Sequence, residues 1–175
     1  ITPERQAQVV MENYDPSFAS SIAQERARRA DNGEDAAVVL VSGYNFGTGS
    51  SREQAATALK YAGVPVVLAG SFSDVFKRNA INNGLICLQC PELVDDLTSS
   101  YAKDGQRGAG GRQPGELSVL LRDATVSLNS RTGAVELRFG NGSVKHYTTR
   151  PAGIGRSIQE IYVAGGMESW VKQRL

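Results

Sequence analysis

The sequence is poor in the residues on which several classes of protein depend. It has two cysteines and one histidine among 175 residues. Two cysteines do not make the disulfide framework of a small secreted domain. The histidine, His146, falls in a segment with the alternating pattern of a β-strand, so we do not expect a Ser–His–acid hydrolase. No apolar run approaches the roughly 20 residues that cross a bilayer, so no membrane-spanning helix is expected.

An excess of charge of one sign is lacking too. Nineteen Lys and Arg balance 18 Asp and Glu, for a net charge of +1, which gives no electrostatic reason to expect a nucleic acid or an anionic membrane as partner. The composition, 41% hydrophobic and 21% charged, is that of a folded protein. The length predicts a single domain over residues 1–175. Because the chain opens at Ile1 rather than Met, we expect a mature product or a piece of a longer protein.

The first hundred residues alternate between helical patterns and short apolar runs. Residues 2–30 predict helix, divided at Asp15–Pro16 because the residue before a proline disfavours the helical conformation. Short continuous apolar runs predict three strands buried on both faces, at 36–41, 64–69 and 85–88. A helical pattern follows each of them, through about residue 61, at 71–83 and at 91–101. This order predicts a parallel sheet with helices beside it.

The second part of the chain has a different pattern. Residues 103–115 hold five glycines and a proline and predict a flexible surface loop. Beyond it, alternating apolar residues and the hairpin signal Asn141–Gly142 predict an antiparallel meander, with strands at 124–128, 134–139 and 143–147. A helical segment with a break at Gly165–Gly166 follows. The predicted fold class is α/β: a mainly parallel sheet, helices beside it, and a small antiparallel β layer.

The segment between the first strand and the next helix predicts an anion site. Residues 43–53 read GYNFGTGSSRE. Glycines let a bound group approach the backbone closely, and the first amides of a helix are unpaired at the positive end of its dipole. Arg52 can grip a carboxylate or phosphate with two hydrogen bonds. In parallel sheets, ligands bind at the carboxyl ends of the strands, which is where this segment falls.

The residues alone leave three interpretations of this segment open. Ser50 and Glu53 have the spacing of a capping box, which needs no ligand. A phosphate cradle is a second interpretation, although Arg52–Glu53 stands where the Walker pattern has Lys followed by Ser or Thr. In the third, Ser50 acts as a base. Helix amides and Arg52 would stabilise its alkoxide, which could take a proton from the carbon next to a bound carboxylate.

Three other groups of residues are expected to be structural. Cys87 and Cys90 have the spacing of a metal or redox motif, but residues three apart on a strand point to opposite faces, and free cysteines are often simply buried. A basic cluster on the second helix is expected to be a solvated face, and four apolar residues have the spacing of core positions. The cluster is Arg26, Arg28 and Arg29, and the core positions are Phe72, Val75, Phe76 and Leu85.

Residues 44–53 (YNFGTGSSRE) resemble the signature of the C-terminal swivel domain of the aconitase superfamily. The likeness continues through 70–76 (GSFSDVF) and 79–85, and is dense over residues 36–97. Gln54 stands where aconitases and isopropylmalate isomerases usually have His, and together with the run 78–83 (RNAINN) is most similar to homoaconitases, those of fungi in particular. The resemblance implies a three-layer β/β/α swivelling domain.

What the resemblance implies about function is a [4Fe-4S] hydro-lyase. A homoaconitase hydrates cis-homoaconitate to homoisocitrate in the α-aminoadipate route to lysine, in mitochondria. Ser50 matches the position of the catalytic base, Ser51 and Arg52 match positions that bind a substrate carboxylate, and Gly47 and Gly49 belong to the turn that shapes the pocket. Three cysteines hold the cluster in the family, with one iron left open as a Lewis acid. They belong to other domains or to a large subunit, which are the expected partners beside a tricarboxylate substrate.

The sequence also departs from the family pattern. An Asp-Thr-Asp-like segment that helps to read the substrate side chain lies upstream in the family, and we find none before the first strand. We therefore expect the isolated chain to be inactive, and the choice of tricarboxylate stays open. The swivel domain or small subunit of 3-isopropylmalate dehydratase, or of aconitase itself, is an alternative. From another class, a non-catalytic anion- or RNA-binding module is possible, although the near-zero net charge disfavours it.

Overall fold

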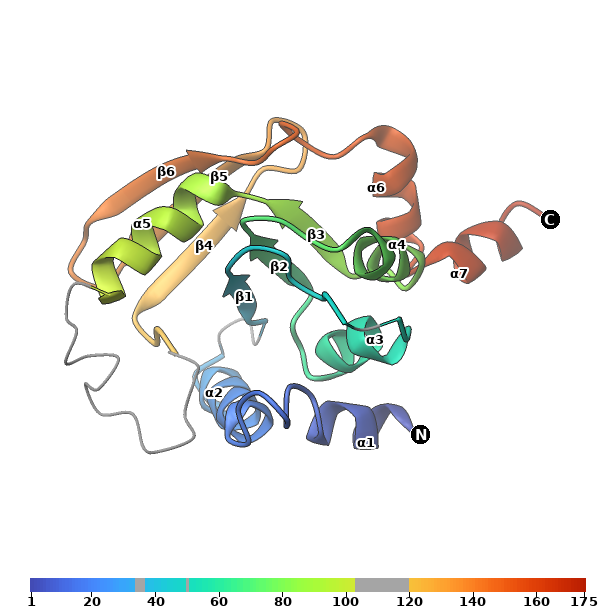
Figure 1. Cartoon of the computed structure of the whole chain (residues 1–175), viewed down its shortest axis with the longest axis horizontal. Helices are drawn as coiled ribbons and strands as arrows, with labels where there is room; N and C mark the ends of the chain where they lie inside the picture. Colours follow the sequence, from blue (N-terminus) through green and yellow to red (C-terminus); the bar gives the residue numbers. More distant parts are fainter. Residues whose placement is uncertain (34–36, 50, 103–119) are drawn as a thin grey trace.

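A computed structural model describes residues 1–33, 37–49, 51–102 and 120–175 (Figure 1). Two predictions fall outside the described residues. They are the structural setting of Ser50 and the flexible loop at 103–115.

The central layer is the predicted parallel sheet. Its strands are β1 (Val39–Ser42), β2 (Val66–Ala69) and β3 (Ile86–Gln89), paired in parallel in the order β1-β2-β3. The predicted burial on both faces holds for the central strand, where Val67, Leu68 and Ala69 are fully buried. It is wrong for β1, which is only half-buried along its length. β1 is one of the two edge strands of this sheet, and the other, β3, buries Cys87 and Leu88.

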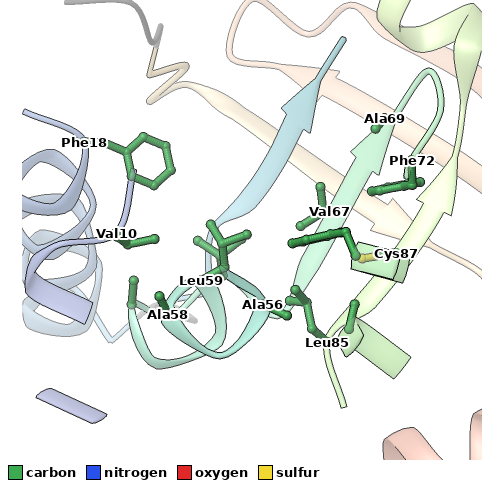
Figure 2. Packing of buried hydrophobic residues seen from close by; sticks show 14 of the residues in the cluster. Val10, Phe18, Ala56, Ala58, Leu59, Val67, Ala69, Phe72, Leu85 and Cys87 are labelled. Atoms are coloured by element: carbon green, nitrogen blue, oxygen red, sulfur yellow. The ribbon is translucent and has the colours of Figure 1, made fainter. Parts of the chain in front are cut away.

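Helices cover one face of this sheet. α1 (Pro3–Gln8), α2 (Phe18–Asp31), α3 (Gln54–Tyr61) and α4 (Asp74–Asn82) lie on that side (Figure 1). Alternate residues of the strands point toward these helices. On β2 they are Val67 and Ala69, which share a core with Leu59 on α3. Figure 2 shows Leu59 and Val67 lying between helix and sheet. The period of two in a strand thus sends one set of side chains to the helical layer.

The other set of strand residues packs on the antiparallel layer. β4 (Ala124–Leu128), β5 (Ala134–Phe139) and β6 (Val144–Thr148) form a sheet in the order β4-β5-β6, within one residue of the predicted bounds. Leu68 and Leu88 share a second core with Val135 and Leu137 of this sheet and with Leu93 of α5 (Pro91–Ala102). The predicted three-layer β/β/α architecture is confirmed.

A lysine side chain ties the turn between the C-terminal helices to the helical layer. α6 (Arg156–Val163) and α7 (Met167–Lys172) are separated by the predicted break at Gly165–Gly166. The Lys60 ammonium at the end of α3 donates to the carbonyls of Asn83 (2.8 Å) and Gly165 (2.9 Å). None of the described helices has the length and apolar composition that spanning a membrane requires.

Two predictions about α4 need correction. α4 begins at Asp74 with Ser73 as its N-cap, not at residue 71. Val75 on its first turn is 51% exposed, although Phe72, Phe76 and Leu85 are buried as expected.

The basic cluster on α2 is not a simply solvated face. Arg28 and Arg29 both donate to the Glu25 carboxylate, which is buried, and the side chain of Arg29 is only 17% exposed. The Arg26 guanidinium donates to the carbonyl of Ala62 at 3.3 Å. The Arg26 bond joins α2 to the end of α3, and Arg29 also donates to the carbonyl of Arg122 at 3.2 Å, so the cluster is part of the packing of the helical layer.

Candidate active site at the carboxyl edge of the sheet

The predicted anion segment lies at the carboxyl edge of the parallel sheet, as expected. We call residues 43–49 the glycine loop. It leaves β1 at Ser42 and runs beside residues 70–73, which leave the neighbouring strand β2. Most of the loop is open to solvent, while Phe46 and Gly47 are half-buried. The loop therefore has a solvent-facing side that a ligand can reach and a side that is anchored to the fold.

The anchored side is held by backbone hydrogen bonds that extend the parallel pairing of β1 and β2. The Gly70 amide donates to the Gly43 carbonyl (3.0 Å), the Phe46 amide to the Ser71 carbonyl (2.9 Å), and the Ser73 amide to the Phe46 carbonyl (2.9 Å). Residues 70–73 are thus used to pair with the loop. This is why α4 starts later than its helical pattern predicts.

Two serine hydroxyls add to this pairing. Ser71 Oγ accepts the Asn45 amide at 2.7 Å, and Asn45 has the left-handed conformation, with φ +57°, that asparagine tolerates better than most residues. Ser73 Oγ donates to the Gly47 carbonyl (3.1 Å) and accepts the Phe76 amide (3.3 Å). One side chain thus caps α4 and fixes the loop.

An aromatic cluster supports the loop from below. The Phe46 ring meets the Phe76 ring nearly at a right angle, with centroids 5.1 Å apart, and Phe72 stacks with Phe76 at 6.3 Å. Edge-to-face packing of this kind is favourable beyond the apolar area that it buries. The rings fix the distance between the loop and the helical layer.

The two glycines predicted to shape the pocket are needed in the loop for different reasons. Gly47 has φ +81°, and a Cβ there would lie 2.3 Å from Cγ of Phe76, so no side chain fits. Gly49 has φ +89°, but a Cβ there would meet no atom of the described residues within 4 Å. Gly47 is required by packing and conformation together, and Gly49 by conformation alone. Within the part of the chain that the structure describes, nothing fills the space beside Gly49.

Ser51 and Arg52 lie between the loop and α3, and both are exposed. α3 begins at Gln54, its N-cap is Glu53, and Glu53 makes no capping hydrogen bond through its side chain. A capping box starting at Ser50 would place the first helical residue at Ser51, three residues before the observed start, and Ser50 itself lies outside the described residues. The arrangement leaves a guanidinium and a hydroxyl in solvent next to exposed loop backbone, which is suited to binding an anion.

One contact at this edge escaped the sequence analysis. The Tyr44 hydroxyl donates to Asp95 Oδ1 on α5 at 2.8 Å. This hydrogen bond raises the pKa of Tyr44 above its ordinary value. The two residues are 51 positions apart, and no local pattern connects them, so only the tertiary structure could reveal the pair.

The two cysteines do not fit an iron–sulfur cluster. The thiolates that hold such a cluster must lie close together. Cys87, however, is buried in the core between the parallel sheet and the helices, and Cys90 in the core between the parallel and antiparallel sheets. The predicted burial on opposite faces is confirmed. Burial raises the pKa of Cys87 to about 12 and also raises that of Cys90, which disfavours the thiolate form. Among the residues that the structure describes, no three His, Cys, Asp or Glu side chains gather to hold a metal ion.

Residues 3–93 match the family described as the aconitase C-terminal domain. The chain belongs to this family. The match covers both the glycine loop and the residues 70–76 that anchor it, so the superfamily resemblance seen in the sequence is confirmed.

Relatives of this aconitase C-terminal domain carry one name repeatedly. The chain is 56% identical over 180 residues to a protein of Mycosarcoma maydis named mitochondrial homoaconitase, and 48% identical over 178 residues to one so named in Cryptococcus neoformans. The whole chain is covered in both, but it spans only 24% of either relative. A solved structure of a 3-isopropylmalate dehydratase from Methanocaldococcus jannaschii is similar with a TM-score of 0.62 at 29% identity, over 99% of this chain and 79% of that one.

The roles of individual site residues stay predictions. The structure places Gly47 and Gly49 in the anchored loop and brings Ser51 and Arg52 beside it, while Ser50 lies outside the described residues. His146 is on the exposed face of β6, and neither it nor the two cysteines belongs to the glycine loop.

Proposed function

We propose that this chain is the substrate-binding and base-carrying domain of a homoaconitase, which hydrates cis-homoaconitate to homoisocitrate in lysine biosynthesis. The observation that carries the proposal is the glycine loop: an exposed, firmly anchored turn that leads into Ser-Ser-Arg at the carboxyl edge of the sheet. The 56% identity to a mitochondrial homoaconitase over the whole chain supports the choice of subfamily, and with it a mitochondrial location.

The chain's own residues supply binding and proton transfer in this proposal. Arg52 binds a carboxylate of the substrate, with Ser51 as a second donor. In hydration, the Ser50 hydroxyl gives its proton to one carbon of the double bond while water adds its hydroxyl group to the other. The proton left from that water restores the serine. In the reverse direction the Ser50 alkoxide takes the proton from carbon.

The remaining parts of the enzyme are assigned to the rest of the polypeptide or to a large subunit. The chain spans about a quarter of its curated relatives, and its two buried cysteines do not fit a cluster. We therefore assign the [4Fe-4S] cluster, which supplies Lewis-acid chemistry to this family, to cysteines of the other domains.

The test uses the full-length enzyme, purified anaerobically with its cluster reconstituted. Hydration of cis-homoaconitate and cis-aconitate and dehydration of 3-isopropylmalate are measured side by side. We expect cis-homoaconitate to be turned over selectively. Preference for another of these substrates would keep the fold and the chemistry but overturn the subfamily.

Variants test the two roles separately. Ser50→Ala should lower kcat by at least about 100-fold, the usual contribution of a positioned acid–base group. Arg52→Gln should lower kcat/KM by roughly 10- to 100-fold, because hydrogen bonds to a charged group are lost. Arg78→Gln, which removes an exposed arginine of α4, is the matched control and should stay near wild type. Near-normal turnover by Ser50→Ala would remove Ser50 from the mechanism.

A further inference from the structure

The side chain of Tyr44 crosses the carboxyl edge of the parallel sheet. It starts in the glycine loop after β1, and its ring lies over Gly70 at the end of β2, where a Cβ would come within 2.8 Å of two ring atoms. Its hydroxyl reaches Asp95 on α5, the helix that follows β3. Because the strands are ordered β1-β2-β3, one tyrosine spans from the loop of the first strand to the helix after the third.

The far end of this contact is on a well-fixed element. α5 buries Leu93 and Val94. The next residue after Asp95 is Asp96, whose carboxylate accepts hydrogen bonds from the Lys145 ammonium (2.8 Å) and the Tyr147 hydroxyl on β6. Two adjacent carboxylates on one helix therefore hold different parts of the molecule: Asp96 holds the antiparallel sheet, and Asp95 holds the glycine loop.

The Tyr44–Asp95 contact adds little buried area, but it restrains the position of the loop. Tyr44 is 54% exposed, so its ring adds little to the core. The other anchors of the loop described above come from one side, residues 70–76. The Tyr44–Asp95 hydrogen bond reaches a separate segment and restrains the loop from the direction of α5.

We propose that Tyr44 and Asp95 are a positioning pair that holds the glycine loop, and through it Ser51 and Arg52, in register for the substrate carboxylate. The proposal rests on the function proposed above. Neither residue needs to touch the substrate. Misplacement of a binding group by about 1 Å can cost as much as 100-fold in rate, so a single hydrogen bond at the base of the loop has a measurable kinetic effect.

The test uses five variants of the full-length, cluster-reconstituted enzyme, one of which combines Tyr44→Phe with Asp95→Ala. Tyr44→Phe keeps the ring over Gly70 and removes the hydroxyl. Asp95→Ala removes the acceptor, and Asp95→Asn keeps an acceptor oxygen without the charge. Tyr61→Phe removes the hydroxyl of another exposed tyrosine, at the end of α3, and is the matched control. Each enzyme is examined by steady-state kinetics and by amide hydrogen exchange of peptides from residues 43–48 and 70–73.

Loss of the contact should loosen the loop and slow the reaction without unfolding the protein. In Tyr44→Phe and Asp95→Ala, exchange of the loop amides should rise about two- to tenfold, the range for loss of one hydrogen bond. kcat per reconstituted cluster should fall by about three- to tenfold. The double variant should be no worse than either single one, since both remove the same interaction. Asp95→Asn and Tyr61→Phe should stay within about twofold of wild type in both measurements.

The exchange measurement separates this proposal from the proposed function. Faster loop exchange in Tyr44→Phe and Asp95→Ala would support the positioning pair even if the enzyme turned over a different substrate. Unchanged loop exchange in both variants would overturn it, as would additive effects in the double variant. A loss in Asp95→Asn equal to that in Asp95→Ala would overturn it too, because the charge would then matter rather than the hydrogen bond.

Discussion

At the scale of single residues, the glycine loop shows how one residue type can serve two purposes. Gly47 and Gly49 both have positive φ angles, but only Gly47 is pressed against a ring, that of Phe76. From the sequence alone, the need for glycine is the same at both positions. The difference lies in what surrounds each Cα, so the two positions should respond differently to the same substitution.

We expect Gly47→Ala to be far more damaging than Gly49→Ala. Gly49→Ala meets only the conformational cost of a left-handed residue, about 1–2 kcal/mol. Gly47→Ala adds a contact of 2.3 Å with Phe76, so the loop must shift, and the total loss in unfolding free energy should reach about 3 kcal/mol or more. Urea unfolding of the chain by circular dichroism measures both. Equal losses in the two variants would contradict the packing argument.

Glu25 gives the helical layer a dependence on pH. Hydrogen bonds from Arg28, and further contacts with Arg29 that offset the cost of burial, lower the pKa of Glu25 from 4.5 to about 2. A carboxyl group whose pKa is lower in the folded state stabilises the fold above its unfolded pKa. That stabilisation is lost as the pH falls from about 4.5 toward 2.

We therefore expect Glu25→Gln to be destabilising near neutral pH and harmless in acid. At pH 7 the loss in unfolding free energy should be about 1–2 kcal/mol, because hydrogen bonds to a buried charge are replaced by weaker ones. The difference from wild type should shrink below pH 4.5 and disappear near pH 2. Urea unfolding across this range measures it, with the exposed Glu168→Gln on α7 as control. A difference independent of pH would rule out the carboxylate as its source.

At the scale of elements, local patterns predicted the strands and helices well wherever nothing competed with them. The antiparallel strands depend on alternation and a hairpin signal, and their bounds agree within one residue. α4 is the instructive exception. Its helical pattern starts at residue 71, but the backbone of residues 70–73 pairs with the glycine loop instead. A long-range pairing overrode a local preference, as tertiary context can.

Ser73 is where the element and the loop meet, and two substitutions separate its roles. Ser73→Ala removes both the cap of α4 and the bond to Gly47, and should cost about 1–2 kcal/mol of unfolding free energy. Ser73→Asp keeps an acceptor for the Phe76 amide but cannot donate to the Gly47 carbonyl. Ser73→Asp should therefore recover most of the unfolding free energy, while amide hydrogen exchange of the glycine loop stays faster than in wild type. Recovery of both by Ser73→Asp would show that the bond to Gly47 is dispensable.

At the scale of the whole molecule, the chain has the architecture of an aconitase C-terminal domain and about a quarter of the length of its homoaconitase relatives. Two layers of side chains, one on each face of the parallel sheet, hold the domain together. The candidate site is at one edge of this sheet and is open to solvent. An open edge fits the proposed function, in which this domain completes a site carried by other domains.

We expect the chain alone to fold but to have no hydratase activity. In the proposed function, the residues of this chain bind and position one end of a substrate, and the metal chemistry of the family is assigned to other domains. Circular dichroism should show the mixed α/β content of the domain, and the cis-homoaconitate assay should show no turnover above background in iron-free buffer. Measurable turnover by the folded, iron-free chain would contradict the assignment of the cluster to the rest of the enzyme.

The sequence by itself determined the layers, the strand order along the chain, the place of the glycine loop and the family. All of these depend on periodicity or on contiguous residues. The tertiary structure alone decided that residues 70–73 pair with the loop, that Val75 faces solvent and that Glu25 is buried among arginines. It also decided that Tyr44 reaches Asp95, 51 residues away. These contacts join segments that are distant in sequence, and their free energy depends on geometry that exists only once the layers have packed.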